Sequence, residues 1–340
     1  MKNLKVQGFV LLDVDVVALN NAGAKETTNF DNAVITKNIK KNGKNYVYVS
    51  GQAWRYWWRE SLQKNIGWKM SPITKEKKIA YTEANPMIYP DDDVFGYMKA
   101  PKGSKETVTR ISPLKNSAIV SVASVNPSVN WSSMSRQDDN SVPYGKEEYS
   151  SIMKGMFSLD LAQVGTFSDY NKTGYVNLSA VLKKEAIESG AELIDDEFVP
   201  QHKLIRINRE TRVKRTIDTL KALKNISGGA MQTNNMGDVT PKFLVLATTK
   251  TGNHPFSHIA TKTGAYDEYA TLDVDALNEV IDDYKDDFEG KIFIGKRAGF
   301  LDEKNDALQK LKEKYSDLIE LKTINEAIDE YCMQVESQMD

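Results

Sequence analysis

The sequence contains very little cysteine and histidine. Of its 340 residues one is Cys and three are His, which excludes an intramolecular disulfide and a cysteine-based zinc site. A reducing cytoplasm is therefore the expected location. His254 and His258 are four residues apart, but Pro255 lies between them and prevents the regular helix that would align two metal ligands. We therefore predict no metal site and no cofactor.

Long apolar runs are also missing. No segment reaches the ~20 apolar residues that a membrane-spanning helix needs. The N-terminal stretch is apolar, but Asp13 and Asp15 interrupt it and no small-residue cleavage site follows, so it does not have the form of a signal peptide. With 40% hydrophobic and 27% charged residues, the composition is that of a folded, soluble protein without a membrane partner.

Motifs for nucleotide hydrolysis and nucleophilic catalysis are lacking. The loop SGGAMQ (227–232) follows a helical pattern, whereas a P-loop follows a strand and opens a helix. The segment KIFIGKRAG (291–299) lacks the first glycine and the Ser or Thr of that motif, and no G-x-S-x-G sequence is present. The acidic run 91–93 favours a helix cap or a partner contact over a metal site, because three consecutive side chains cannot share one face. These absences favour a protein that is not an enzyme.

Charge is divided unevenly along the chain. Residues 1–250 carry 35 Lys and Arg against 26 Asp and Glu, whereas residues 251–340 carry 10 against 21. This division indicates a basic body that binds a polyanion and an acidic region that faces solvent or a partner. Chance, with solvated helices at the C-terminal end, is the alternative explanation.

The order of elements predicts an α+β fold. Residues 3–17 alternate so that Leu4, Val6, Val10, Leu12, Val14 and Val16 share one face, which predicts a strand with one buried side. A hairpin turning at Asn42-Gly43 and a helix over 52–64 capped by Ser50 follow. Further segments are strands at 110–125, 149–165 and 242–249, helices at 176–189 and 208–226, and, from 272 onward, helix, strand, helix and helix. This order fits a modified ferredoxin-like or RRM domain with large insertions.

Basic residues concentrate on two of these helices and precede a glycine pair. Arg55 and Arg59 lie on one stripe of the first helix, and guanidinium groups bind phosphate in a bidentate manner. The helix 208–226 is rich in Arg and Lys and ends before Gly228 and Gly229, whose missing Cβ atoms would admit a polyanion to the backbone. A solvated helix face and ordinary glycine capping remain alternatives. The partial negative charge of a helix C-terminus opposes phosphate there, so the basic side chains must overcome it.

Four collinear segments resemble a known family. YVSGQAWRYWWRESL (48–62), DVFGYM (93–98), RISPLKNS (110–117) and LKNISGGAMQ (223–232) are similar to the DevR family of CRISPR-associated proteins, the backbone subunits of type I-B Cascade complexes. The resemblance extends from residue 1 to about 250. It implies an RRM-like palm over 1–250 with a helical insertion at about 66–108, a β-hairpin thumb at about 121–148, and an acidic α/β C-terminal extension over 251–340 packed on the palm.

The resemblance also implies partners and contact residues. The chain would bind CRISPR guide RNA, reach target DNA through that guide, form a head-to-tail filament with other copies of itself, and contact other Cascade subunits. The expected RNA-binding residues are Ser50, Gln52, Arg55, Arg59, Lys37, Lys115, Met134, Arg136, Arg209, Arg212, Lys224, Gly228, Gly229, Met231 and Gln232.

Two other functions stay open at this point. Related backbone subunits of type III complexes cut target RNA with an aspartate near the first helix, and Asp31 is the corresponding candidate in a metal-dependent endoribonuclease of the same fold. An acidic-tailed scaffold that binds only proteins is the third hypothesis. We favour the non-catalytic RNA-binding subunit.

Overall fold

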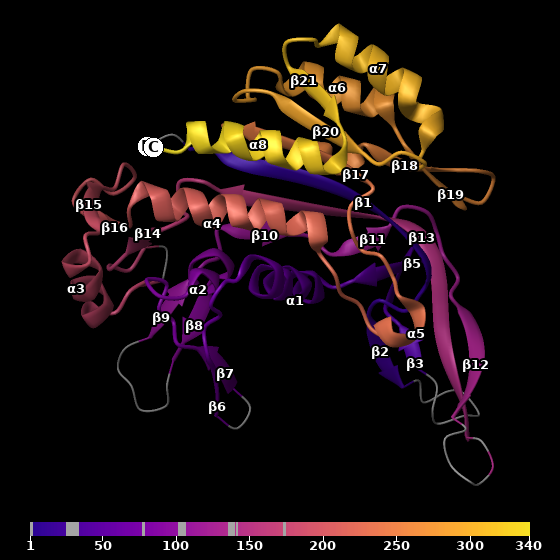
Figure 1. The fold of residues 1–340 in the computed structure, drawn as a ribbon, viewed down its shortest axis with the longest axis horizontal. Helices are drawn as coiled ribbons and strands as arrows, with labels where there is room; N and C mark the ends of the chain where they lie inside the picture. Colours follow the sequence, from indigo (N-terminus) through magenta and orange to yellow (C-terminus); the bar gives the residue numbers. More distant parts are fainter. Residues whose placement is uncertain are drawn as a thin grey trace.

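A large mixed sheet forms the centre of the molecule (Figure 1). The computed structural model describes residues 3–24, 34–76, 79–100, 107–134, 140, 142–172 and 175–340. Along the sheet the strand order is β21-β20-β17-β1-β13-β11-β5-β4. These strands are β1 (Lys5–Val17), β4 (Asn38–Lys41), β5 (Lys44–Val49), β11 (Ile119–Ser121), β13 (Val142–Asp160), β17 (Phe243–Thr249), β20 (Ile292–Lys296) and β21 (Ile319–Lys322).

Shorter strands extend this sheet or form small separate sheets. Four of them join it off the main path: β2 (Asn21–Ala24), β3 (Val34–Thr36), β10 (Leu114–Asn116) and β12 (Ser128–Met134). The separate pairs are β6 (Ile73–Glu76) with β7 (Ile79–Thr82), β8 (Tyr97–Lys99) with β9 (Val108–Arg110), and β18 (Ala260–Thr263) with β19 (Tyr269–Leu272). A three-stranded sheet contains β14 (Thr166–Ser168), β15 (Glu192–Asp195) and β16 (Lys203–Arg206).

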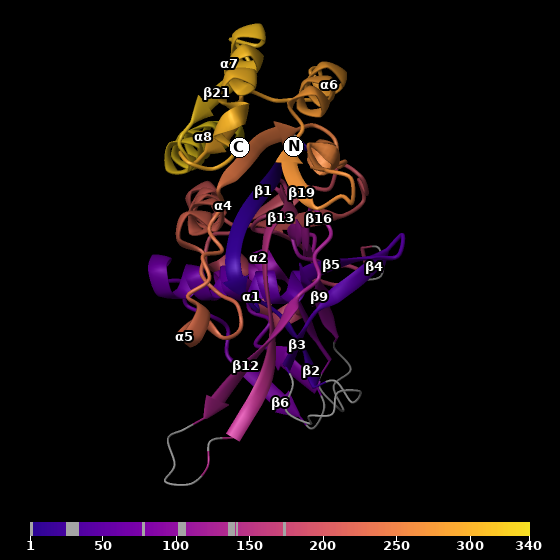
Figure 2. The same cartoon turned by 90° about the vertical axis from the view of Figure 1, so that its right-hand side faces the viewer.

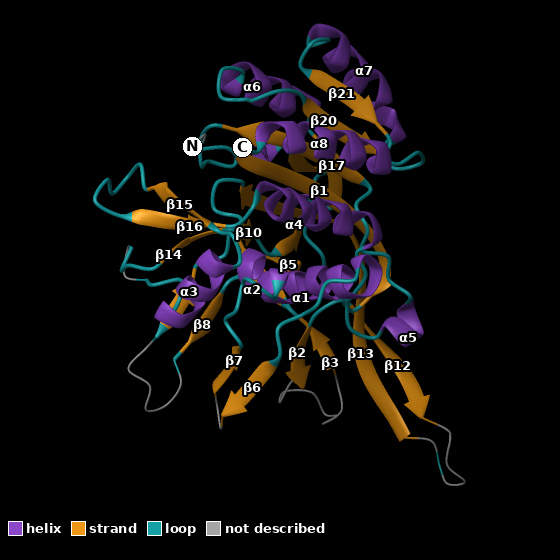
Figure 3. Ribbon diagram, turned by 60° about the vertical axis from the view of Figure 1, so that its left-hand side comes forward, coloured by secondary structure: helices purple, strands orange, loops and turns teal. Residues whose placement is uncertain are grey.

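Helices cover both faces of the main sheet. One face carries α1 (Gly51–Ser61), α4 (Arg209–Lys221) and α8 (Ile324–Gln338), which lie side by side in Figure 3. The other carries α6 (Val274–Tyr284) and α7 (Asn305–Lys314). Figure 2 shows α8 and α6 on opposite sides of the sheet. The remaining helices are α2 (Pro90–Phe95), α3 (Ala180–Glu188) and the single turn α5 (Gln232–Asn235).

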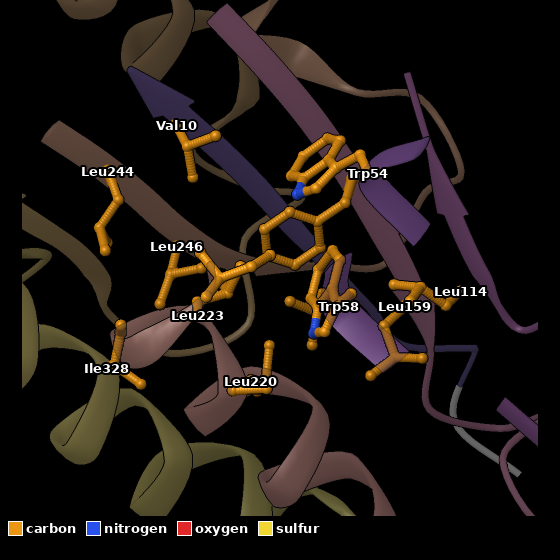
Figure 4. Close-up of a cluster of buried hydrophobic side chains, with 14 of the residues drawn as sticks. Val10, Trp54, Trp58, Leu114, Leu159, Leu220, Leu223, Leu244, Leu246 and Ile328 are labelled. Carbon is orange, nitrogen blue, oxygen red and sulfur yellow. The ribbon is translucent and has the colours of Figure 1, made fainter. Parts of the chain in front are cut away.

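Tryptophans of α1 form the centre of the larger core (Figure 4). Trp54 and Trp58 stack with ring centroids 5.5 Å apart, and the ring of Phe157 on β13 packs edge-on at 5.0 Å from Trp58. The indole N–H of Trp58 donates to the Thr219 carbonyl of α4 at 2.8 Å, so its polar atom is satisfied inside the core. These aromatic residues attach α1 to the sheet.

The first strand differs from its prediction because both of its faces are buried. Phe9 and Leu11 are fully buried against the layer of α6 and α7, while Val6 and Val10 face α1 and α8. The predicted single buried side was therefore wrong, since the C-terminal layer covers the second face. Val16, predicted to be buried, is 53% exposed at a φ of 46°, where the pairing of β1 with β13 shifts register.

A two-stranded arm projects from the body beside α5 (Figure 1). It is formed by β12 and the first half of β13, paired from Ser128↔Glu148 to Met134↔Val142. The second half of β13 then pairs with β1 inside the sheet, so one 19-residue strand belongs to both the arm and the body. The sequence predicted this strand to begin near 149 because the polar arm residues lack an apolar face. The arm occupies the segment predicted to be the thumb.

The segment 66–108 contains little helix. Its described residues form the β6–β7 hairpin, the six-residue α2, and β8 and the start of β9. The hairpin predicted at Asn42-Gly43 is confirmed as β4–β5, with both turn residues at positive φ, 51° and 76°. The strands β20 and β21 of the predicted C-terminal extension continue the main sheet beside β17.

Candidate nucleic-acid interface

Three segments that are distant in sequence meet at Leu19 and Asn20, just beyond the end of β1. The Ala230 N–H donates to the Leu19 carbonyl at 3.0 Å, and the Lys37 N–H donates to the Asn20 carbonyl at 2.8 Å. The Ser50 N–H donates to the Asn20 side-chain Oδ1 at 3.0 Å. The turn 19–20 thus joins the glycine loop, the β3–β4 connection and the start of α1 into one surface.

The N-terminus of α1 supplies an electropositive element at this surface. Ser50 caps the helix as predicted, and its Oγ accepts from the Ala53 N–H at 3.3 Å. Gln52 is exposed beside it. The first-turn amides of an α-helix have no acceptor within the helix, and its dipole places partial positive charge there. The unfavourable dipole at the end of α4 is therefore offset by the opposite helix end at the same surface.

Packing requires glycine at positions 228 and 229. A Cβ at Gly228 would lie 2.2 Å from Cδ1 of Trp57, and one at Gly229 would lie 2.7 Å from Cδ2 of Leu19. Gly229 also has a φ of 111°, which a side chain disfavours. The sequence interpretation assigned the missing Cβ atoms to a bound polyanion, whereas in the structure Trp57 and Leu19 fill that space. The loop closes tightly on α1 and β1 as a result.

The continuation of this loop is held in an unusual backbone conformation. Met231 has a φ of 57° and opens α5. The side-chain amide of Gln232 donates to the carbonyls of Gly228 and Gly237, the latter at 3.2 Å. Gln232 therefore ties the two ends of the loop together, and Met231 lies half-buried between them.

The base of the arm contacts α5 on the same side of the molecule. Glu148 accepts from Lys146 Nζ at 2.6 Å and from Asn130 Nδ2 at 2.9 Å, and the nearby Asn235 side chain of α5 helps to lower its pKa. Burial raises the pKa of Glu148, but these hydrogen bonds and the Lys146 charge outweigh it and hold the pKa below its ordinary value. Met134 ends β12 with a side chain outside the described residues, and Arg136 lies wholly outside them.

The two arginines predicted on α1 are engaged within the protein. The Arg55 guanidinium donates to the carbonyls of Leu114 and Phe95 at 2.7 and 2.8 Å, and to the side chains of Asn116 and Ser112 at 3.0 and 2.9 Å. Burial, followed by the charge of Arg59, lowers the pKa of Arg55 to about 10. Arg59 pairs with Asp91 at 2.7 Å. Both side chains thus connect α1 to the segment 91–116.

The predicted basic residues of α4 and of the turn that follows it contact α8 and the two residues after it. Arg209 donates to the carbonyls of Met339 and Glu336 at 2.9 and 2.6 Å, and the buried Arg212 donates to that of Asp340. Burial lowers the pKa of Arg212 to about 10. Lys224 pairs with Asp329 of α8. Cations at a helix C-terminus stabilise its dipole, so these contacts anchor α8 to α4.

The acidic run 91–93 is buried, and each of its carboxylates accepts at least one hydrogen bond within the fold. Asp93 is contacted by Arg110 and by Arg215, the latter at 2.6 Å, while Asp91 bonds Arg59. In the part of the chain that the structure describes, no group of three His, Cys, Asp or Glu side chains could hold a metal ion. Asp31 lies outside that part. Among the described residues no helix is long and apolar enough to cross a membrane.

The structure therefore gathers some of the predicted site residues and disperses others. The loop Gly228–Gln232, the helix start Ser50–Gln52 and Lys37 converge around Leu19 and Asn20. Arg55, Arg59, Arg209, Arg212 and Lys224 hold other elements together, and Lys115 lies on β10, near the opposite end of β1. Sequence reasoning missed Asn20, because its role depends on three chain segments meeting.

The chain matches a known protein family over most of its length. Residues 12–273 match the family described as "CRISPR-associated negative auto-regulator DevR/Csa2". The chain belongs to the DevR/Csa2 family. Curated proteins gave no match.

Two solved structures share the fold of this family member. One chain of a "CRISPR RNA-guided surveillance complex" is 11% identical with a TM-score of 0.52, and one of a "CRISPR RNA-guided surveillance complex, pre-nicking" is 11% identical with a TM-score of 0.54. Each match covers 97% of this chain and 99% of the other. The family is CRISPR-associated, and the two structural matches show a shared fold.

Proposed function

We propose that the protein is a non-catalytic backbone subunit of a type I-B Cascade complex that grips guide RNA at the Leu19–Asn20 surface. The observation that carries this proposal is the convergence of the α1 N-terminus, Lys37, the loop 228–232 and the arm base at one place. Copies would associate head to tail along the guide and leave its bases free to pair with target DNA.

The topology supports an RRM-like or ferredoxin-like palm. Taken in chain order, β1, α1, β11, β13, α4 and β17 follow the pattern strand–helix–strand–strand–helix–strand. In the sheet these four strands have the antiparallel order β17-β1-β13-β11, with both helices on one face. This is the arrangement that a split βαβ domain of this type requires.

The chemistry of the surface suits a sugar–phosphate chain. Helix N-terminal amides and a lysine bind phosphate without distinguishing bases. The carboxylates near it are already bonded, since Glu148 contacts Lys146 and Asn130, and Glu147 accepts from the Thr36 N–H at 2.8 Å. Weak sequence preference and strong salt dependence are therefore expected.

A double substitution tests the surface. Gln52→Glu combined with Lys37→Glu adds two carboxylates and removes one ammonium group at the α1 N-terminus and beside it, a net charge change of −3. An acidic residue in the first turn favours the helix dipole, so the fold should tolerate the change. We expect the purified variant to lack co-purifying RNA, measured as the 260 to 280 nm absorbance ratio and by extraction and gel analysis.

The matched control carries the same charge change away from this surface. Gln63→Glu combined with Lys75→Glu alters exposed residues just beyond the C-terminal end of α1 and on β6. It should keep wild-type RNA content. If both double variants retain RNA equally, the guide does not contact the Leu19–Asn20 surface, and if the wild-type protein carries no RNA in its assembled form, the RNA-binding role itself is refuted.

The absence of catalysis is tested separately. Assembled protein is incubated with complementary RNA and Mg²⁺, and intact RNA is expected. Regularly spaced cleavage that disappears in Asp31→Ala would instead identify the metal-dependent endoribonuclease.

A further inference from the structure

We propose that the protein has a second nucleic-acid surface, which binds the phosphodiester backbone of a single strand on the sheet face opposite α1, beside the part of that face that the C-terminal layer covers. We call it the lysine face and define it by Lys41, Lys115, Lys154 and Tyr48. The argument for this surface is independent of the proposed guide site. It rests on the proposed function only in that the protein is tested while loaded with guide RNA.

Strand register places the lysine face on one side of the sheet. Lys154 of β13 pairs with Val120 of β11, which pairs with Tyr48 of β5, so these three side chains form a row across the strands. Lys41 of β4 pairs with Lys44 of β5, and Lys44 lies two pleats from Tyr48 on the same strand. Lys115 of β10 pairs with Ser158 of β13, which lies two pleats from Lys154. Because side chains alternate along a strand, all of them project to the same face.

Packing of α1 shows that this face is the opposite one. Phe157 of β13 contacts Trp54 and Trp58 of α1, and a Cβ at Gly155 would lie 3.0 Å from the Trp54 ring. The alternate residues of β13, among them Lys154, Met156 and Ser158, therefore point away from α1. The sheet itself separates the lysine face from the Leu19–Asn20 surface.

The composition of these strands is strongly biased in charge. The strands β4, β5, β10 and β11, with residues 150–159 of β13, contain five lysines and no Asp or Glu. Lys44 is compensated by Asp267 of the β18–β19 hairpin at 2.8 Å. Lys154 donates to the Ser257 carbonyl at 2.8 Å, and no carboxylate within the described residues pairs with Lys41, Lys115 or Lys154. Several cations lie here without counterions.

The cations on this face also influence one another. Burial and then the charge of Lys41 lower the pKa of Lys154. A bound anion would relieve this repulsion, whereas a neutral or basic partner would not. Charge complementarity therefore selects a polyanion as the occupant.

Half-exposed apolar side chains between the lysines favour a single strand over a duplex. Tyr48 and Val120 are each partly exposed on this face, whereas Met156 packs against the C-terminal layer. Bases of a single strand stack on aromatic and apolar side chains regardless of sequence, whereas a duplex keeps its bases stacked inside. With one aromatic residue, the surface should show little base preference.

Fluorescence anisotropy with guide-loaded protein tests the proposal. The probe is a labelled 30-nucleotide DNA strand not complementary to the guide, titrated at several NaCl concentrations. In the variant Lys41→Gln, Lys115→Gln, Lys154→Gln we expect weaker binding and a salt slope reduced by about 2, since each phosphate contact contributes roughly 0.7 for single strands. Comparing this probe with an RNA strand of the same sequence shows whether ribose or deoxyribose strands bind more tightly. If a duplex binds more tightly than the single strand, the single-strand assignment is refuted.

Controls separate this surface from the guide site. Lys75→Gln, Lys285→Gln, Lys310→Gln removes three exposed lysines elsewhere and should leave the slope unchanged. The lysine-face variant should keep its guide RNA, because loss of guide RNA would mean that the lysine face belongs to the guide path. Since Lys154 also bonds Ser257, the double variant Lys41→Gln, Lys115→Gln checks the result without that contact, with an expected slope change of about 1.4. Unchanged binding in both variants would overturn the proposal.

Discussion

Gly228→Ala distinguishes a glycine that serves packing from one that admits a ligand. The added Cβ would lie 2.2 Å from Cδ1 and Cγ of Trp57, whereas carbon atoms in contact prefer about 3.5–4.0 Å. The buried Trp57 or the loop must therefore move by more than about 1 Å. Overpacking of this kind costs about 1–3 kcal/mol. Gly228 does not have a positive φ, so the cost comes from the clash and not from backbone strain.

Thermal unfolding of RNA-free protein measures this cost. With an unfolding entropy of about 2.1 cal/mol/K per residue, a chain of this length loses roughly 1.4 °C per kcal/mol, which predicts a Tm lower by about 1.5–4 °C. Gly252→Ala is the control, because its Cβ would meet only Lys5 Cε at 3.7 Å. Gly228→Ala should cost less in a Trp57→Leu background than in the wild type, because the smaller side chain leaves room for the Cβ.

The opposite outcome would refute the packing explanation. If Gly228→Ala unfolds at the wild-type temperature but no longer retains RNA, the missing Cβ serves the ligand, as the sequence interpretation first held. A variant that loses stability and still binds RNA would place the glycine in the fold alone.

Two further predictions concern charge. Asp93→Asn leaves Arg110 and Arg215 without their buried counterion and should lower the free energy of unfolding by about 3–5 kcal/mol in urea denaturation. Asp267 pairs with two exposed lysines, so Asp267→Asn should cause no measurable loss of stability. The depressed pKa of Glu148 stabilises the arm base above pH 4.5, and that stability is lost as the pH falls through the folded-state value. Glu148→Gln should flatten this acid limb of a Tm-against-pH profile. A mutant profile parallel to wild type would contradict the role of Glu148.

Local patterns predicted several elements well. The capping Ser50 and the aromatic residues of α1 indicated its position, and Asn42-Gly43 identified a turn that only residues tolerant of positive φ adopt. The α+β class followed from the order of these elements, and four short segments carried the family resemblance.

Local patterns failed where distant segments supply the environment. The second buried face of β1 depends on residues more than 200 positions away, and the polar arm half of β13 has no apolar periodicity because it leaves the core. Arg55 has the sequence environment of a phosphate ligand, yet its partners Phe95 and Leu114 are brought to it only by folding.

By itself the sequence determined the family, the fold class and the basic character of the body, because motifs, periodicity and charge are properties of neighbouring residues. Tertiary structure alone decided which cations remain available to a ligand. Arg55, Arg209 and Arg212 are held by carbonyl groups of other segments, while the side chains of Lys37, Lys41 and Lys115 find no such acceptor among the described residues. Whether a guanidinium or an ammonium group is free depends on acceptors that only the folded chain brings within hydrogen-bond distance.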